Sequence, residues 1–344
     1  MTEKKALPII NFMTGTACNW HCKYCLQGKE TGFDKKVDVQ AFLKKFIPWF
    51  ENYMDKMGFD HVDKFQFWGG EPLLYLDTIK QIHEGIKDYK YLRPTRIVTN
   101  GSLVDDDFVK WVNDNKIFVN VSYHDGQLSD EQWEKCLKIR NMIVTALIHH
   151  KRLNLDELRA KWQYIWDKWG RCTRWCIATI YAVDGVPTDY YLTKDDVDQW
   201  IKYLKEVVIP QAKTDPFYHH VLNLFVAIFA EFADYGPNDN PCYNKSIVSV
   251  DLRGNFYYCH HDVDKNTIAG NIFDPLSIWK ELPPISDQCK KCDILHYCHG
   301  SCIRDNAHDV TCYLYREQYK VYKDVWENQH HLIDPQVFGH KFHG

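Results

Sequence analysis

Short apolar runs alternate with longer segments of helical spacing over the first 125 residues of the chain. The runs rich in β-branched and aromatic residues predict strands at Pro8–Thr16, Lys64–Trp68, Arg96–Thr99 and Ile117–Tyr123. Apolar residues three and four positions apart predict the helices between them, at Val37–Met57, Tyr75–Lys87 and Leu103–Asn113. Repeated strand–helix units of this kind indicate a parallel sheet or a barrel.

The alternation continues less regularly to residue 183. It predicts helices near 129–138 and 155–169, and strands near 142–149 and 177–183. About six strand–helix units fit, fewer than the eight of a full barrel. We therefore expect an α/β fold with a partial, TIM-like (β/α)6 barrel. The functional site of such folds lies at the carboxyl ends of the strands, where the Gly, Asn, Asp and Cys residues of this chain fall.

A loop at Tyr235–Asn240, with the sequence YGPNDN, predicts the end of the barrel. Before it, helices are predicted at Lys194–Val207 and His219–Ala233, and a closing helix is predicted at Thr311–Asn328. The predicted domains are a barrel with a helical connector over residues 1–235, a cysteine-rich domain over 236–329, and a flexible tail over 330–344. The tail has four histidines but no periodicity, which favours a frayed terminus over a metal site.

Charge and hydropathy exclude several classes of function. The 46 acidic residues exceed the 42 basic ones, which argues against a broad electrostatic grip on nucleic acid or on an anionic membrane. The most apolar stretch, Val221–Ala230, is too short to span a membrane. No small-residue cleavage site follows a long apolar segment near the N-terminus, so we expect no signal peptide and a cytoplasmic location.

The chain has 13 cysteines, and their distribution is uneven. An odd number in a chain of this size is a poor fit to a disulfide framework, and clustered cysteines in a reducing compartment more often bind metal. Three of them lie within residues 18–25, and seven lie after residue 240. Two separate cysteine-rich zones therefore flank a cysteine-poor middle.

The first zone has the spacing C-x3-C-x2-C, formed by Cys18, Cys22 and Cys25 at the end of the first predicted strand. Three thiolates on one tight loop can bind three irons of a four-iron cluster and leave the fourth iron open. An open metal position is typical of a catalytic centre. The alternative is a structural zinc site with His21 as the fourth ligand.

This loop resembles the signature of the radical SAM superfamily, in which an aromatic residue, here Tyr24, precedes the last cysteine. Three further strand ends are similar to that family: Gly69-Gly70-Glu71-Pro72, Thr99-Asn100-Gly101, and Ser122 with His124-Asp125-Gly126. The resemblance covers residues 8 to 215. It implies that S-adenosylmethionine (SAM) is bound by Tyr24, Gly69, Gly70, Glu71, Pro72, Thr99, Asn100 and Ser122. The Glu71 carboxylate is suited to pair the SAM ammonium group.

The second zone is similar to the SPASM extension of radical SAM enzymes that modify peptides. In that family the extension holds two auxiliary four-iron clusters, so the resemblance implies three [4Fe-4S] clusters in all. The first auxiliary cluster would use Cys242, Cys259 and Cys302. The second would use Cys289, Cys292, Cys298 and Cys312. The alternative is one or two structural zinc sites on the same thiolates.

The chain departs from the sulfatase-maturating enzymes, whose layout it otherwise resembles. Only three cysteines are assigned to the first auxiliary cluster. Its fourth ligand is a distant side chain, with Cys172 and Cys176 as candidates, or a water molecule, or the substrate itself. His260 stands where those enzymes carry an aspartate proposed as the base, and an imidazole can act as a base or as a hydrogen-bond donor to a cluster. No residue is assigned to the SAM carboxylate.

The resemblance implies that a reduced cluster cleaves SAM, and that the 5′-deoxyadenosyl radical abstracts hydrogen from a substrate C–H bond. We expect a peptide or protein side chain as substrate, an external electron donor of the flavodoxin or ferredoxin type, and a separate protein that recognises a leader peptide. One alternative is the same chemistry on a small molecule or a modified nucleobase. Another is a zinc-stabilised binding module without enzymatic activity.

Overall fold

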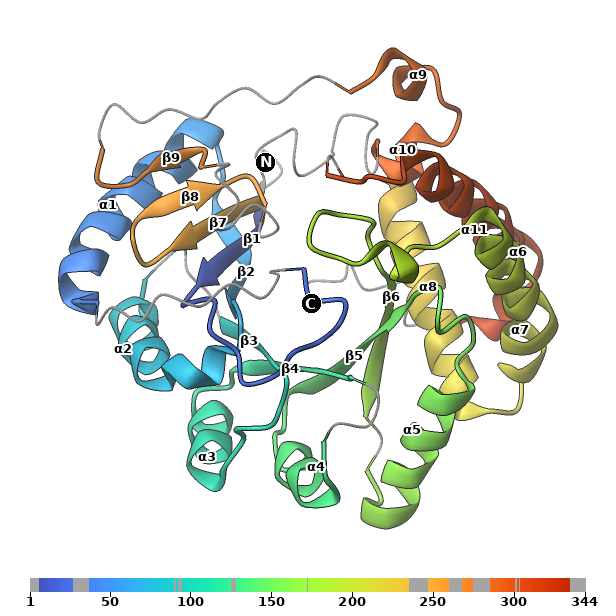
Figure 1. Ribbon diagram of the computed structural model, residues 1–344, viewed down its shortest axis with the longest axis horizontal. Helices are drawn as coiled ribbons and strands as arrows, with labels where there is room; N and C mark the ends of the chain where they lie inside the picture. Colours follow the sequence, from blue (N-terminus) through green and yellow to red (C-terminus); the bar gives the residue numbers. More distant parts are fainter. Residues whose placement is uncertain are drawn as a thin grey trace. The chain divides into compact units, whose positions relative to one another are not determined.

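The computed structural model describes residues 6–26, 37–89, 91, 95–124, 128–171, 173–234, 247–259, 268–274, 285–300, 302 and 304–334. They form an α/β structure of parallel strands and flanking helices (Figure 1). The chain divides into two compact units. The first contains Met1–Met142 and Pro241–Pro283, and the second contains Ile143–Asn240 and Pro284–His343. The domain limits expected from the sequence, at residues 235 and 329, stay a prediction.

The first unit is built on a sheet. Its strands are β1 (Ala6–Met13), β2 (His61–Trp68), β3 (Thr95–Thr99), β4 (Phe118–Ser122), β7 (Ile247–Asp251), β8 (Asn255–Tyr257) and β9 (Gly270–Asn271). Their order is β4-β3-β2-β1-β7-β8-β9. β1 to β4 run parallel, and β7 pairs in parallel with β1, whereas β8 and β9 are antiparallel additions. The carboxyl ends of β1 to β4 therefore share one edge of the sheet, as expected.

The helices of the first unit follow the predicted pattern. They are α1 (Val39–Met57), α2 (Leu76–Ile86), α3 (Asp106–Asp114) and α4 (Asp130–Leu137), with a 3-10 turn at Pro72–Tyr75. Asp38 and Asp105 cap α1 and α3 by accepting hydrogen bonds from backbone N–H groups in the first turn. The core is aromatic: Phe12 of β1 meets Phe42 and Phe46 of α1 edge-on, with ring centroids 5.5 and 5.8 Å apart.

Buried polar side chains link three strands of this sheet. Asn11, in the middle of β1, is only 2% exposed. Its Nδ2 donates to Ser249 Oγ of β7 at 3.4 Å, and its Oδ1 accepts from Gln66 Nε2 of β2 at 3.0 Å. A polar residue inside an apolar strand is tolerated when both of its polar atoms are paired. Asn11 therefore fixes β7 beside β1.

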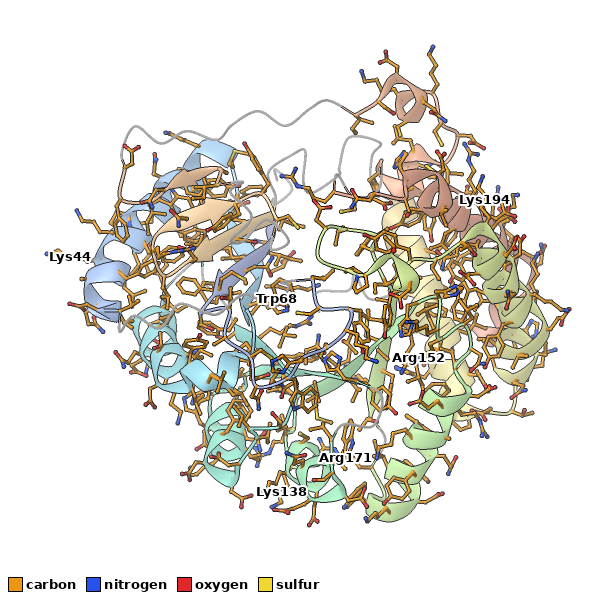
Figure 2. All side chains as sticks on the ribbon, viewed as in Figure 1. Lys44, Trp68, Lys138, Arg152, Arg171 and Lys194 are labelled. Atoms are coloured by element: carbon orange, nitrogen blue, oxygen red, sulfur yellow. The ribbon has the colours of Figure 1, made fainter. Side chains whose placement is uncertain are left out.

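The turn from β7 to β8 is held by Asp251, whose side chain is fully buried. Its Oδ1 accepts from the backbone N–H groups of Arg253 and Asn255, and its Oδ2 accepts from the Arg253 guanidinium and from Tyr257 Oη. Tyr257 in turn packs with Met13, and Trp68 at the end of β2 lies against them. Figure 2 labels Trp68. The hairpin is thus fixed to the carboxyl ends of β1 and β2.

The second unit contains the parallel pair β5 (Met142–Ile148) and β6 (Arg174–Thr179). Its helices are α5 (Asp156–Trp169), α6 (Lys194–Tyr203), α7 (Ile209–Gln211), α8 (Pro216–Asp234), α9 (Asp287–Lys290), α10 (Leu295–Cys298) and α11 (His308–Asn328). A π-helical stretch, Leu204–Val208, joins α6 to α7, and 3-10 turns lie at Thr188–Tyr190 and His330–Leu332.

Aromatic side chains join three helices of the second unit. Phe229 of α8 lies 5.5 Å, between ring centroids, from Tyr297 of α10 and from Tyr319 of α11. Phe225 of α8 stacks on Tyr322 of α11 at 5.7 Å. This packing sets α10 and α11, which carry cysteines, against the apolar helix α8. Across the described part of the chain, none of the helices combines the length and the apolar character that a membrane span requires.

Candidate radical SAM site and cysteine quartet

Three cysteines lie on the loop that follows β1. Cys18, Cys22 and Cys25 carry free thiols, and each is half-buried. Burial raises the pKa of Cys22 to about 12, and repulsion from the thiolates of Cys25 and Cys18 adds to the shift. Groups that repel one another in this way lie close together. A cationic metal centre would relieve this repulsion, so the donor set fits an iron–sulfur cluster with one open iron.

Tyr24 attaches this loop to the end of β4. The tyrosine is buried, and its Oη lies 3.0 Å from Nδ1 of His124, two residues after β4. The edge of the Trp20 ring also meets the His124 ring, with 5.6 Å between centroids. His124 thus contacts two residues of the cysteine loop, one on either side of Cys22. The sequence analysis placed His124 only at a strand end, and nothing in the residue types indicated these contacts.

Asn100, directly after β3, contacts the same loop from a third strand end. Its Nδ2 donates to Asn19 Oδ1 at 2.9 Å and reaches Cys18 Sγ at 4.0 Å. Its Oδ1 accepts from Ser102 N and Oγ, and Ser102 Oγ also accepts from Asn19 Nδ2 at 2.8 Å. Asn19 and Ser102 were not predicted as site residues, although Asn19 is next to Cys18 and Ser102 is two residues after Asn100. The network holds the first cysteine in place.

The two glycines after β2 allow two backbone segments to touch. Gly70 N donates to Gly15 O at 3.0 Å, and Glu71 N donates to Ala17 O at 2.8 Å. A Cβ on Gly69 would lie 2.2 Å from Gly15 O, and a Cβ on Gly70 would lie 2.1 Å from Ala17 O. No other residue type fits without moving the backbone. Gly69 and Gly70 therefore lock the start of the cysteine loop onto the end of β2.

Glu71 is fully buried and ties β2 to β3. Its Oε1 accepts from Thr99 Oγ1 at 2.7 Å and from Leu73 N at 3.0 Å, and its Oε2 accepts from Asn100 N at 2.7 Å. Burial raises the pKa of the Glu71 carboxyl, and these three donors oppose that shift. The carboxylate thus positions Asn100. Pairing of Glu71 with the SAM ammonium group stays a prediction.

The other predicted SAM-binding residues lie along the same edge of the sheet. Pro72 is buried at the start of the 3-10 turn that Glu71 caps. Thr99 is the last residue of β3 and is opposite Val121 in the parallel register with β4. Ser122 is the last residue of β4 and is half-buried. All eight predicted residues therefore belong to the first unit, at strand ends or on the cysteine loop.

Replacing Gly70 with alanine is expected to disturb this site. The new Cβ would collide with two backbone oxygens, those of Thr16 and Ala17, which cannot rotate away. We expect the free energy of unfolding to fall by about 1–3 kcal/mol, and SAM cleavage to fall by up to about 100-fold as the cysteine loop shifts. Denaturant unfolding and 5′-deoxyadenosine production measure the two effects.

Gly85→Ala is the matched control for this substitution. A Cβ on Gly85 would lie 2.4 Å from Leu43 Cδ1, which is the end of a movable side chain. Gly85 lies inside α2, where alanine is the better helix former. Its SAM cleavage should match that of the unmodified protein. Normal cleavage by Gly70→Ala as well would contradict the role given to the glycine contact.

Four further cysteines gather in the second unit. Cys289 lies in α9, Cys292 follows it, Cys298 ends α10, and Cys312 lies in the first turns of α11. Burial raises the pKa of Cys312 to about 11, and repulsion from Cys289, Cys298 and Cys292 adds to it. Burial likewise raises the pKa of Cys298, with repulsion from Cys292 and Cys289. We call these four residues the cysteine quartet. Its donor set fits a four-iron cluster.

The remaining predicted residues lie outside the described part of the chain or are divided between the two units. Cys242, His260 and Cys172 lie outside the described residues. Cys259 follows β8 in the first unit, whereas Cys302 and Cys176 belong to the second unit, Cys176 within β6. The first auxiliary cluster and the role of His260 therefore stay predictions. Among the described residues, no set of three or more His, Cys, Asp or Glu side chains is arranged to hold a single metal ion.

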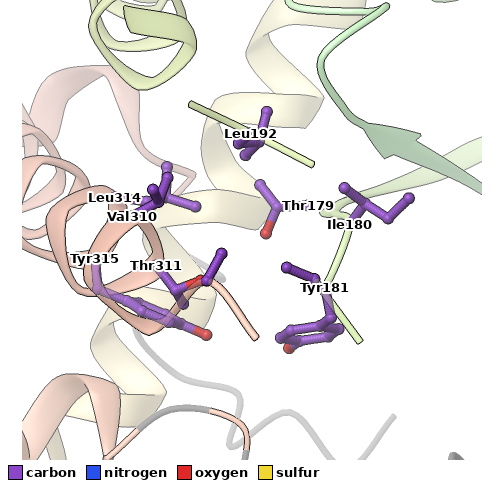
Figure 3. A pocket seen from close by; sticks show the side chains of 10 residues that line it. Thr179, Ile180, Tyr181, Leu192, Val310, Thr311, Leu314 and Tyr315 are labelled. Carbon is purple, nitrogen blue, oxygen red and sulfur yellow. The ribbon is translucent and has the colours of Figure 1, made fainter. Parts of the chain in front are cut away.

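Residues 304–307, which we call the Asn306 strap, are hydrogen-bonded to the loop that follows β6. Asn306 N donates to Ala182 O at 2.6 Å, and Asn306 Nδ2 donates to Asp184 Oδ1 at 2.9 Å. A cavity beside this strap has Tyr181 on one side and Thr311 and Tyr315 on the other (Figure 3). Its volume of about 10 Å³ is close to that needed for one water molecule. It is too small to be a substrate site.

Comparison with known proteins gives a family match for residues 12–142 of the first unit. The model of the radical SAM superfamily matches residues 12–142. Over 133 residues the chain is 28% identical to 7-carboxy-7-deazaguanine synthase of Methanocaldococcus jannaschii, a match that covers 37% of this chain and 53% of that protein. The chain therefore spans about half the length of this curated relative.

Two solved structures share the fold. The chain is similar to anSMEcpe with bound AdoMet, with 18% identity, a TM-score of 0.70, and coverage of 96% of this chain and 97% of that one. It is also similar to Streptococcus suis SuiB bound to precursor peptide SuiA, with 14% identity, a TM-score of 0.58, and coverage of 87% and 72%. These matches confirm the expected α/β fold, a partial barrel with a cysteine-rich C-terminal region.

The family match begins in β1 and ends at the start of β5, so it contains the cysteine triad, the two glycines, Glu71, Asn100 and Ser122. These are the residues that carried the resemblance in the sequence. The superfamily implies one [4Fe-4S] cluster and SAM as cofactors. The radical SAM resemblance is thus confirmed over residues 12–142, which match the model of that superfamily, whereas the SPASM resemblance stays a prediction.

Proposed function

We propose that this chain is a radical SAM enzyme that oxidises or cross-links a peptide or protein side chain. Cys18, Cys22 and Cys25 would hold the cluster, which supplies one electron for the homolytic cleavage of bound SAM. Tyr24 and His124 hold the loop from one strand end, and Asn100 holds it from another. The backbone at Gly69 and Gly70, together with Thr99 and Ser122, would hold SAM along the same edge of the sheet.

The cysteine quartet is the observation that supports a redox step in addition to SAM cleavage. A radical SAM core needs one cluster, and a second set of four clustered thiols suggests an additional redox centre. Hydrogen abstraction leaves a carbon radical on the substrate. Loss of one further electron to the auxiliary centre and of one proton to a base completes a two-electron oxidation. His260 is the proposed base, and an external flavodoxin- or ferredoxin-type protein would donate the electron that cleaves SAM.

A peptide substrate is supported by what the structural neighbours bind. SuiB was solved with precursor peptide SuiA, and anSMEcpe was solved with AdoMet and the Cp18Cys peptide. The neighbours share the fold with this chain. We propose that a separate protein presents the leader peptide to this enzyme.

A small-molecule substrate is the second candidate. It is favoured by the match to 7-carboxy-7-deazaguanine synthase, whose name indicates a nucleobase-like product. That match is confined to 133 residues, fewer than half of this chain. It gives no reason for the cysteine quartet. We therefore place the peptide first and the small molecule second.

Anaerobically reconstituted and reduced protein is expected to convert SAM to 5′-deoxyadenosine, with faster production when the correct substrate is present. Liquid chromatography with mass spectrometry measures the product. Candidate peptides and 7-deazaguanine precursors are compared side by side, with aerobically inactivated protein as the blank. Stimulation by a peptide supports the first candidate, and stimulation by a deazapurine only would replace it with the second. No 5′-deoxyadenosine under any of these conditions would contradict both.

A further inference from the structure

One face of α11 is directed at the cysteine quartet. His308, Cys312 and Arg316 are spaced four residues apart, so they lie on the same side of the helix. His308 Nε2 lies 3.7 Å from Cys289 Sγ and 3.5 Å from Cys312 Sγ. The Arg316 guanidinium lies beside Cys292, a third thiol of the quartet. Every thiol of the quartet except that of Cys298 is therefore contacted by a side chain of this face or belongs to it.

Arg316 makes a direct contact with a sulfur. Its Nη2 donates to Cys292 Sγ at 3.1 Å, and its Nη1 donates to Asp293 Oδ1 at 2.8 Å. The planar guanidinium is thus fixed by two neighbouring residues of one turn. Its charge also interacts favourably with the thiolate of Cys312. An arginine keeps this charge at every pH at which proteins are studied.

The ion pair between Arg316 and Asp293 does not by itself explain why Arg316 lies at the quartet. Asp293 is 76% exposed and Arg316 is 44% exposed, so water screens the pair and its contribution to stability is small. The contact with Cys292 differs in kind, because a hydrogen bond from a cation to a thiolate changes the electron density at a metal ligand. The side chain is therefore placed to act on whatever the quartet binds.

We propose that Arg316 raises the reduction potential of the auxiliary iron–sulfur cluster held by the quartet, and so makes that cluster a better electron acceptor. This inference rests on the proposed function, because it requires the quartet to hold iron and sulfide. Reduction adds one negative charge to a cluster. A fixed positive charge and a hydrogen bond to a ligand sulfur stabilise the reduced form more than the oxidised form. The electron that the cluster accepts is the one lost by the substrate radical.

The test is a redox titration of the full chain followed by electron paramagnetic resonance. Cys18, Cys22 and Cys25 are changed to alanine in all samples, so that only auxiliary clusters contribute. In Arg316→Gln, one midpoint potential should fall by the equivalent of about a tenfold change in the equilibrium constant, about 59 mV for one electron. The same transition should be lost in Cys312→Ala, which assigns it to the quartet. Arg316→Lys keeps the positive charge but loses the planar set of guanidinium N–H donors, so its midpoint potential should fall by less.

Lys320→Gln is the matched control. Lys320 lies one turn further along α11 and pairs with Glu317, so its replacement removes the same charge without touching a thiol. Its potentials should equal those of the parent. Iron and sulfide contents are measured in every sample. A potential in Arg316→Gln equal to that of Lys320→Gln, at equal iron content, would overturn the inference.

The remaining outcomes separate the inference from the proposed function. If Arg316→Gln fails to assemble its cluster, Arg316→Lys is compared with the parent instead. A midpoint potential in Arg316→Lys equal to that of the parent would then overturn the inference. If the parent protein binds zinc at the quartet instead of iron and sulfide, the auxiliary centre and this inference both fall. SAM cleavage by the chain with its triad intact would still stand in that case, because it depends on the first unit alone.

Discussion

Replacing Cys18, Cys22 and Cys25 with alanine is expected to abolish SAM cleavage and to remove about four iron atoms per chain from anaerobically reconstituted protein. With three clusters the unmodified chain would bind about 12 iron atoms, and the variant about 8. The triad lies on the loop that follows β1, at the shared strand edge, and repulsion from Cys25 and Cys18 adds to the raised pKa of Cys22. Iron and acid-labile sulfide assays together with 5′-deoxyadenosine production measure both effects.

Cys136→Ala is the matched control, because this thiol is also in the first unit but does not belong to the triad. It is fully buried and donates weakly to Gly101 O at 3.8 Å. Its replacement should leave the iron content and SAM cleavage unchanged. Zinc in place of iron at both cysteine groups would instead support a zinc-stabilised binding module. About four iron atoms with zinc at the remaining thiols would keep the SAM site and remove the auxiliary redox centres.

The strands and helices of the barrel could be predicted because their patterns are local. β2, β3 and β4 end within one residue of their predicted ends, each at a turn or a change in polarity. The prediction for β6 was wrong by several residues, since the strand is Arg174–Thr179 and not 177–183. Ile180, Ala182 and Val183 are as buried as strand residues, but they lie in the loop that the Asn306 strap covers. Apolar residues in a sequence predict that their side chains are buried, but they do not predict which backbone groups form hydrogen bonds.

The strand β7 shows why long-range pairing could not be predicted. Its five residues give no indication that they pair with β1, more than 230 positions earlier. The pairing depends on Asn11 and Ser249, two polar residues that look misplaced until their hydrogen bond is seen. β7 lies within residues 236–329, the predicted cysteine-rich domain, and in the structure it pairs with β1. Contacts between residues so far apart in the chain produce no periodic pattern in the sequence from which they could be predicted.

The candidate site was predictable in its residue types but not in its interactions. Cysteine spacing and the Gly-Gly-Glu-Pro segment indicated the correct strand ends, because they stand at breaks in the apolar pattern. Asn19, Ser102 and His124 were not singled out as ligand-binding or supporting residues. Each acts through hydrogen bonds or ring contacts to a predicted residue, and such contacts depend on the fold. The contact between Arg316 and Cys292 is of the same kind.

Replacing Glu71 with glutamine is expected to be far from conservative. The carboxylate accepts hydrogen bonds from Thr99 Oγ1, Leu73 N and Asn100 N, and the side chain is fully buried. Whichever way the new amide is turned, its NH2 group faces at least one N–H or O–H donor. A buried donor without an acceptor costs free energy, and the ionic component of the other bonds is also lost. We expect the free energy of unfolding to fall by about 3 kcal/mol.

The catalytic consequence follows from Asn100. Its backbone N–H is held by Glu71, and its side chain reaches Asn19 and Cys18. Displacement of Asn100 should therefore shift the first cysteine of the triad and lower SAM cleavage by about 100-fold. Thr99→Val removes one donor to Glu71 and leaves two, so its effects on stability and cleavage should be intermediate. It also provides a measurable variant if Glu71→Gln does not fold.

Asp105→Ala separates loss of stability from loss of function. Asp105 caps α3 through one hydrogen bond to Phe108 N, and its removal should cost about 1 kcal/mol of stability. Because it has no link to the cysteine loop, its SAM cleavage per folded molecule should be unchanged. Glu71→Gln should lose cleavage well beyond what its lower stability explains. Equal cleavage per folded molecule in the two variants would show that Glu71 supports the fold only, and that its bond to Asn100 does not position the triad.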